Sequence, residues 1–204
     1  MTLSGCDASS ACTESMISCL KENNISFVGR YYSDTTHIAG KKLTASEAQL
    51  LSSNGIDLVA VFEDAPTEAS YFSASRGTRD ANAALAQAAS VGQPAGSAIY
   101  FTVDYDASQS DIDGVITDYF QAIAATLGTQ YVTGVYGSGN TCTAILKSGH
   151  AKLAWLAQST GWGGYQSFHD WVIKQGPEGS ICGLSSDSDE AQGDFGAFRV
   201  AVPA

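Results

Sequence analysis

The chain has 204 residues, 44% of them hydrophobic, and its 10 Lys and Arg against 21 Asp and Glu give a formal charge of -11 at pH 7. So few cations cannot form a groove that tracks a phosphate backbone, which argues against a nucleic-acid partner. The longest apolar runs, such as LVAVF and AIYF, are far below the roughly 20 residues of a membrane helix, so we expect no membrane span. We expect a monomer with one domain over residues 1–204.

The N-terminus has neither a basic region nor an apolar leader, so no secretory signal is visible in the chain as given. Charged residues make up only 15% of the chain, whereas Ser, Thr and Gly are abundant, a composition more usual outside the cell. We therefore expect a secreted or extracellular protein.

The five cysteines form no CxxC pair and have no His at zinc-finger spacing, which argues against a structural zinc site. In a secreted protein they allow up to two disulfides with one thiol left over, and the sequence leaves their pairing open. The alternative is that most of them are small buried apolar residues. They are Cys6, Cys12, Cys19, Cys142 and Cys182.

Strand-like and helix-like segments alternate along the first two thirds of the chain, a pattern typical of βα units around a parallel sheet. A short strand ends at Asp7, and residues 13–24 read as a helix with Thr13 as a possible cap. The helix expected at residues 43–55 opens with the capping-box pattern Thr44-x-x-Glu47 and closes at Gly55. The further expected strands are 26–32, 57–63, 97–106 and 131–137, and the further expected helices are 78–92, 108–127 and 140–149.

After residue 149 the clear helical segments stop. Residues 152–158 and 170–175 read as a sixth and a seventh strand, and a Gly-, Ser- and Asp-rich stretch follows. An eighth strand in FGAFRVAV, residues 195–202, would close a barrel. The fold class we predict is a single α/β TIM-like barrel with irregular or missing helices in the C-terminal third.

Acidic side chains stand at the carboxyl ends of several predicted strands, where the catalytic groups of parallel α/β barrels gather. Asp7, Glu63 and Asp104 follow three of them, and Asp194 precedes the predicted last strand. Alternation along the fourth strand places Thr102 with Asp104 on the face that points into the barrel mouth. Asp106 is equally well explained as the cap of the next helix.

Carboxylates that converge in a partly buried mouth repel one another, which keeps one protonated while another stays ionised. Glycoside hydrolysis needs such a pair of carboxyl groups. We therefore predict Asp104, Glu63, Asp7 and Asp194 as catalytic residues.

Polar and aromatic residues near the same strand ends are candidates to bind a sugar, because aromatic faces stack on sugar rings and amides bond to hydroxyls. We expect Tyr31 and Trp155 to belong to the core instead. No nucleotide-binding, metalloprotease or hydrolase-elbow motif occurs, so we expect no cofactor and no metal. The candidate sugar-binding residues are Arg30, Tyr32, Asp106, Tyr136, Gln158, Trp162 and Gln175.

The segments GCD, FVGRYY, LTASEAQLLSSNGIDLVAVFE, IYFTVDYD and GVYG together resemble the glycoside hydrolase-like barrel family known as domain of unknown function 1906. That family is related in fold to the glycoside hydrolase family 25 lysozymes, which cleave peptidoglycan glycan strands with an Asp-x-Glu pair at the end of the fourth strand. The resemblance aligns Thr102 with the Asp and Asp104 with the Glu, so this chain lacks one acid of the pair.

Two functions follow as hypotheses. The first is a hydrolase that cleaves a cell-wall glycan, peptidoglycan or a related amino-sugar polymer, with a polysaccharide as its partner. The second is a carbohydrate-binding or cell-wall-associated barrel that kept the cleft and lost the chemistry, as Thr102 suggests. A hydrolase that uses a divalent metal is less well supported, because no defined ligand set can be assembled from the sequence.

Overall fold

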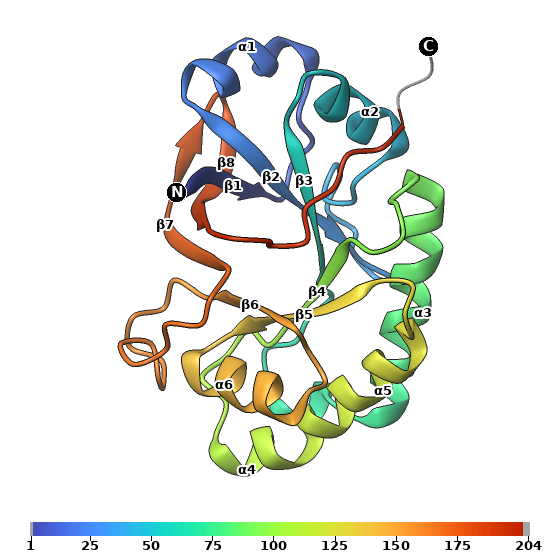
Figure 1. Ribbon diagram of the computed structural model, residues 1–204, viewed down its shortest axis with the longest axis vertical. Coiled ribbons are helices and arrows are strands. Elements are labelled where there is room, and N and C mark those ends of the chain that lie inside the picture. Colours follow the sequence, from blue (N-terminus) through green and yellow to red (C-terminus); the bar gives the residue numbers. More distant parts are fainter. Residues whose placement is uncertain (1, 202–204) are drawn as a thin grey trace.

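The computed structural model describes residues 2–201, in which eight strands form one closed barrel in the order β1 to β8 (Figure 1). Neighbouring strands from β1 to β7 are parallel, as the alternation of strands and helices predicts. The strands are β1 Leu3–Ala8, β2 Ile25–Tyr32, β3 Asp57–Phe62, β4 Ala98–Thr102, β5 Val132–Gly137, β6 Leu153–Leu156, β7 Ile173–Ile181 and β8 Leu184–Ala191.

Helices follow the first five strands, and several begin at side-chain caps. Ser73 caps α3, and Thr44 caps α2 by accepting a hydrogen bond from the backbone N–H of Glu47. The expected capping box is only half formed, because the Glu47 carboxylate pairs with Arg30 instead. The helical segments are α1 Glu14–Glu22, α2 Ala45–Ser53, η1 Ala69–Tyr71, α3 Ala74–Val91, α4 Gln109–Asp111, η2 Ile112–Ile116, α5 Thr117–Leu127 and α6 Gly139–Ser148.

Two expected helices differ from the structure in detail. The helix predicted from residue 78 starts four residues earlier, at Ala74. The helix predicted over 108–127 is divided, since η2 is a π-helical turn with non-helical backbone angles at Gly114. None of the helices within residues 2–201 is long and apolar enough to cross a membrane.

The prediction of the eighth strand is wrong. The strand that closes the barrel is β8, inside the Ser- and Asp-rich stretch, and it runs antiparallel to both β7 and β1. Residues 195–201 of the expected strand instead cross the amino-terminal ends of β3 and β4, where Phe198 pairs with Leu58 and the Gly196 carbonyl accepts from Ala98. Val202 lies outside the described residues.

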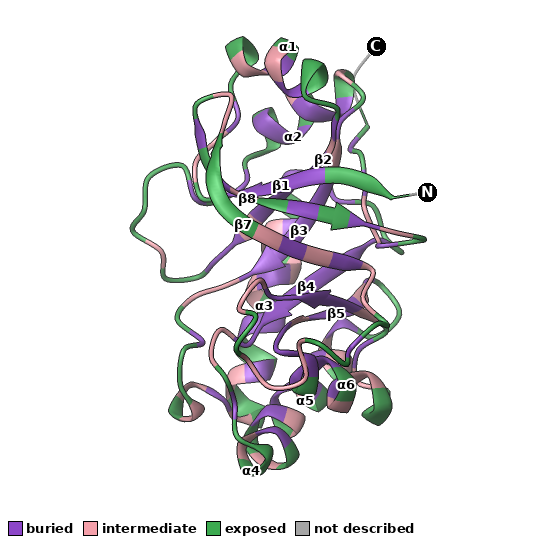
Figure 2. Cartoon of the chain, turned by 90° about the vertical axis from the view of Figure 1, so that its left-hand side faces the viewer, coloured by how far each residue is buried: buried purple, intermediate pink, exposed green. Residues whose placement is uncertain are grey.

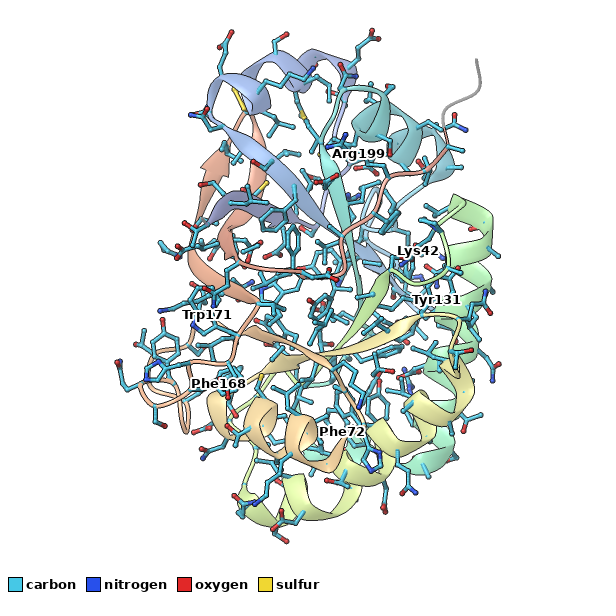
Figure 3. All side chains as sticks on the ribbon, viewed as in Figure 1. Lys42, Phe72, Tyr131, Phe168, Trp171 and Arg199 are labelled. Carbon is cyan, nitrogen blue, oxygen red and sulfur yellow. A yellow bond between two sulfur atoms is a disulfide. The ribbon has the colours of Figure 1, made fainter. Side chains whose placement is uncertain are left out.

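The side of the barrel formed by β7 and β8 has no covering helix, as we predicted for the C-terminal third (Figure 2). The hairpin of these two strands projects beyond the barrel, and its tip is tied to α1 by a disulfide between Cys19 and Cys182 (Figure 3). The remaining cysteines, Cys6, Cys12 and Cys142, are buried free thiols. Both roles considered for the cysteines therefore occur, since two of them form a disulfide and three are small buried residues.

The barrel interior is filled by large rings that lie against glycines. The Phe27 ring occupies the space where Gly5 would carry a Cβ, and the Tyr100 ring does the same at Gly134. Both rings are fully buried, in a cluster that also holds Trp155. The interior is thus a packed core that closes the barrel below its mouth.

We expect Gly134→Ala to lower the free energy of unfolding by about 1–3 kcal/mol, because a methyl group there collides with the Tyr100 ring. Chemical denaturation of the variant and the wild type measures the change. Gly161→Ala is the control, since a Cβ at that exposed position meets nothing within 4 Å. Equal stability of both variants would show that Tyr100 is not packed against β5.

Candidate active site

A cavity of about 290 Å³ opens at the carboxyl ends of the parallel strands. Its lining residues come from all eight strands or from the loops that follow them, and its floor is Trp155. The lining residues are Asp7, Tyr31, Val61, Glu63, Thr102, Asp104, Tyr136, Trp155, Gln158, Ser159, Gln175 and Asp187. We call this cavity the mouth.

Most of the acids and amides singled out in the sequence line the mouth. Three of the four predicted catalytic carboxylates, Asp7, Glu63 and Asp104, converge there. Three of the predicted sugar-binding residues, Tyr136, Gln158 and Gln175, join them. The alternation argument for the fourth strand holds, because Thr102 and Asp104 both face the cavity.

Asp194 does not lie at the mouth, contrary to its predicted position. It follows β8, which is antiparallel, so the end of that strand lies at the opposite side of the barrel. Its carboxylate accepts a hydrogen bond from the N–H of Gly196, next to the start of β4. We therefore remove Asp194 from the candidate site.

Arg30 and Tyr32 do not line the mouth either, because their side chains point outward from β2. The Arg30 guanidinium is fully buried against Glu47, 2.7 Å away, and the Tyr32 hydroxyl donates to Gln93. Side chains alternate along a strand, so it is Tyr31 that faces inward. Tyr31, expected in the core, lines the mouth.

Asp106, in the loop after β4, and Trp162, in the loop after β6, do not line the mouth. The Asp106 carboxylate accepts a hydrogen bond of 2.8 Å from the N–H of Gly163. Asp106 is not the cap of the following helix either, since Ser108 takes that position. Asp106 thus ties the loop after β4 to the loop after β6, which carries Trp162.

The sequence analysis missed two acids of β8, Asp187 and Asp189. Asp187 lines the mouth, and Asp189 is buried below it. Their spacing of two residues is the signal that was available, since it puts both on one face of a strand. The strand itself was not predicted, because its segment is rich in polar residues that are uncommon in strands.

A hydrogen-bond network holds Asp7 in place on β1. Its carboxylate accepts from the Tyr31 hydroxyl at 2.7 Å and from the Gln175 amide at 2.9 Å. The same amide nitrogen also donates to Asp187 at 2.9 Å, and the amide oxygen accepts from Tyr136 at 2.8 Å. Gln175 therefore links three walls of the mouth.

Asp189 lies beneath this network. One of its oxygens accepts from the indole N–H of Trp155 at 3.1 Å, while the other has no hydrogen-bond partner among the described residues. Burial, together with the nearby charge of Asp7, raises the pKa of Asp189 well above its ordinary value. Burial thus favours the protonated form of Asp189 beneath Asp7.

Burial also raises the pKa of the carboxyl groups of the mouth itself. Burial raises the pKa of Asp7 from 3.8 to about 6, although hydrogen bonds from Tyr31 and Gln175 oppose the shift. Burial, followed by the charge of Glu63, raises the pKa of Asp104. The mouth therefore holds protons at a pH where isolated carboxyl groups have lost them.

Glu63 and Asp104 have different surroundings. The Glu63 carboxylate forms an ion pair with Lys41 at 2.5 Å, and the Lys41 ammonium also lies over the Tyr31 ring. The Asp104 side chain accepts no hydrogen bond from the described residues, and only its backbone is bound, through Pro66. The two candidate catalytic carboxyl groups are thus one paired anion and one unpaired acid.

No cluster of three His, Cys, Asp or Glu side chains within the described part of the chain has an arrangement that holds a metal ion.

Residues 18–195 match the model of the Rv2525c-like, glycoside hydrolase-like domain, so the chain belongs to this family. The family agrees with the resemblance noted in the sequence. A curated relative, the uncharacterized protein YbfG of Bacillus subtilis strain 168, is 33% identical over 223 residues. The alignment covers 99% of this chain but 30% of YbfG, so the chain spans about a third of that relative.

Solved structures share the fold. The Tat-secreted protein Rv2525c of Mycobacterium tuberculosis superimposes with a TM-score of 0.83 at 23% identity, over 96% of this chain and 98% of that one. A muramidase from Acremonium alcalophilum superimposes with a TM-score of 0.59 at 16% identity, over 94% of both chains. The barrel is thus shared with a cell-wall enzyme and with a secreted protein.

Stability should depend on pH through Asp7. Because folding raises its pKa, the folded chain binds this proton more tightly than the unfolded chain. The resulting stabilisation is present below pH 3.8 and is lost as the pH rises to about 6. We expect the free energy of unfolding to fall over this interval, with Asp7 contributing up to about 3 kcal/mol of the fall.

Urea denaturation at several pH values measures this fall in the wild type and in Asp7→Asn, where it should be smaller. Asp170→Asn is the control, because that carboxylate is exposed and does not line the mouth. An unchanged fall in Asp7→Asn would contradict the assignment.

Proposed function

We propose that this protein hydrolyses a glycan, with an amino-sugar polymer of a cell wall as the substrate class. Asp104 is the catalytic acid and Glu63 is the second carboxylate. The observation that carries the proposal is the contrast between these two groups, which share one cavity but differ in their partners. Glycoside hydrolysis needs one protonated and one ionised carboxyl group.

In this mechanism Asp104 protonates the oxygen of the glycosidic bond that breaks. Its position supports this role, because burial favours the protonated form and no described donor stabilises the anion. Glu63 stabilises the positive charge that develops on the sugar, or activates the nucleophilic water, while Lys41 fixes its orientation. Asp7, held by Tyr31 and Gln175, orients the sugar through its hydroxyl groups.

The comparisons support this proposal at the level of class. The family is described as glycoside hydrolase-like, and the fold is shared with a muramidase. We also propose that the protein is a monomer that acts outside the cell, since the disulfide suits an oxidising compartment and Rv2525c is Tat-secreted.

A carbohydrate-binding barrel without catalysis is the second candidate. Thr102 favours it, because a residue that cannot ionise stands where the lysozymes have an acid, and its hydroxyl donates to the Phe62 carbonyl instead. The two functions share the mouth and differ in whether bonds in the glycan break.

Asp104→Asn tests the catalytic role. We expect the release of reducing ends from chitosan, chitin or peptidoglycan to fall by about 10²–10⁴-fold, because the amide cannot donate the required proton. Binding of the same polymer should persist. Asp118→Asn, an exposed carboxylate on α5, serves as the control. Full activity in Asp104→Asn on every polymer that the wild type cleaves would disprove the assignment.

The catalytic rate constant kcat should fall on the alkaline side of its pH profile. Because the pKa of Asp104 is raised, kcat should be highest below neutrality and should fall as the pH rises and this acid loses its proton. Added salt screens long-range repulsion from the charge of -11 but leaves this limb of kcat in place. A kcat that is constant or rises toward alkaline pH would favour the binding function.

A further inference from the structure

The acid proposed to donate the catalytic proton takes its position from its backbone, because its carboxyl group has no hydrogen-bond partner among the described residues. The backbone N–H of Asp104 donates to the carbonyl of Pro66 at 2.9 Å. The N–H of Val103, one residue earlier, donates instead to the carbonyl of Tyr136 at 2.8 Å. Pro66 belongs to the loop that follows β3, so this loop holds the end of the neighbouring strand segment in place.

The loop after β3 serves both candidate catalytic carboxyl groups. Glu63, its first residue, lines the mouth, and Pro66, three residues later, binds the backbone of Asp104. Asp64 lies between them, and its side chain is only 2% exposed. A group that holds Asp64 therefore holds the segment on which the position of Asp104 depends.

The Asp64 carboxylate anchors this segment with both of its oxygens. Oδ1 accepts hydrogen bonds from three groups of the loop after β2, the Ser33 hydroxyl at 2.5 Å and the N–H groups of Asp34 and Thr35 at 3.0 and 3.1 Å. Oδ2 forms an ion pair with the Arg76 guanidinium at 2.7 Å. Asp64 thus ties the loop after β3 to the neighbouring loop and to α3.

Arg76 is itself held firmly on the first turn of α3. Its Nε lies 2.7 Å from the carboxylate of Asp80, and its guanidinium lies over the Tyr71 ring, 4.2 Å from the centroid. Asp80 is fully buried and also accepts from the hydroxyls of Tyr71 and Tyr119 at 2.7 and 2.9 Å. A planar guanidinium that is engaged at both of its sides holds Asp64 in one geometry.

We infer that Asp64 is a positioning residue, which together with Arg76 fixes the loop after β3 and thereby the place of Asp104 in the mouth. The inference rests on the proposed function in that Asp104 is the acid whose placement matters. A misplacement of a reacting group by about 1 Å can cost about 10²-fold in rate. The Asp64–Arg76 pair should therefore act on kcat, whereas the side chains that line the mouth keep their contacts with the glycan.

Asp64→Asn tests this inference, because it removes the ion pair but keeps an oxygen for the three donors of the loop after β2 and leaves Arg76 paired with Asp80. We expect kcat for glycan hydrolysis to fall by about 10–100-fold and KM to change by less than about twofold. Arg76→Lys should have the same effect, since a single ammonium does not replace the fork that bonds to both carboxylates.

Hydrogen exchange of backbone amides gives a second readout, which does not depend on catalysis. In Asp64→Asn the Asp104 amide should exchange about tenfold faster, because its bond to Pro66 opens more often when the loop is less firmly held. The Val103 amide, which is not bound to this loop, should keep its wild-type rate. A general loss of stability would instead speed up both amides together.

Asp34→Asn is the matched control, because it removes another carboxylate–arginine pair of α3, with Arg79 at 2.6 Å, whose side chains are 40% and 56% exposed. An exposed pair contributes little, so this variant should keep the wild-type kcat and exchange rates. An Asp104 amide in Asp64→Asn that exchanges at the wild-type rate, or faster only together with Val103, overturns the inference.

The two readouts also separate this inference from the proposed function. If the wild type cleaves none of the polymers, the hydrolase is disproved, and selectively faster exchange at Asp104 still supports the role of Asp64. If the wild type cleaves a polymer and Asp64→Asn keeps its kcat, the hydrolase stands and the positioning role is disproved.

Discussion

The packing of rings against glycines inside the barrel is the constraint on which the site depends. Gly29 leaves room for Trp155, because a Cβ there would lie 2.8 Å from both the indole ring and the side chain of Asp7. Trp155 in turn forms the floor of the mouth and donates to Asp189. The polar groups of the mouth therefore stand on a dry, rigid base, which is why burial changes their protonation so strongly.

The antiparallel direction of β8 determines which acids reach the mouth. A parallel eighth strand would bring its last residues to the rim, whereas β8 brings its first ones. Asp187 near its start therefore lines the mouth, and Asp189 lies one layer lower. The same reversal produces the hairpin with β7, whose tip the disulfide of Cys182 holds against α1. One change of strand direction thus brings Asp187 to the mouth and forms the hairpin that the disulfide ties to α1.

The sequence predicted the parts of this structure in which local pattern and tertiary role agree. Asp104 was found because it ends an apolar alternating strand, and a strand end is where a barrel places its site. The roles of Tyr31 and Arg30 were predicted the wrong way round. The register of β2 with β1 decides which side chains of β2 face the barrel interior, and a sequence of apolar and aromatic residues does not reveal that register.

Other parts depended on partners far away in the chain. Lys41 lies on a loop with no recognisable pattern, and only folding brings it to Glu63. Strand β8 is stabilised by its two neighbours rather than by its own composition, so its residues LSSDSDEA gave no strand signal. The Asp194 error has the same origin, since the position of that residue follows from the direction of a strand that was not recognised.

The carboxyl groups of the mouth differ in the neighbouring groups that compensate their negative charge. Asp7 has two donors, Glu63 has a lysine, and Asp187 has two amides. Asp104 alone among the acids of the mouth accepts nothing from the described residues, although it is half-buried. When charges repel in a confined space, a proton goes first to the groups whose anions are least stabilised.

Protonating Asp104 therefore breaks no hydrogen bond or ion pair of the described residues, whereas Glu63 is held in an ion pair with Lys41 at 2.5 Å. In the proposed mechanism, a substrate that enters the mouth excludes water, which strengthens the repulsion among the remaining anions and so favours the protonated form of Asp104.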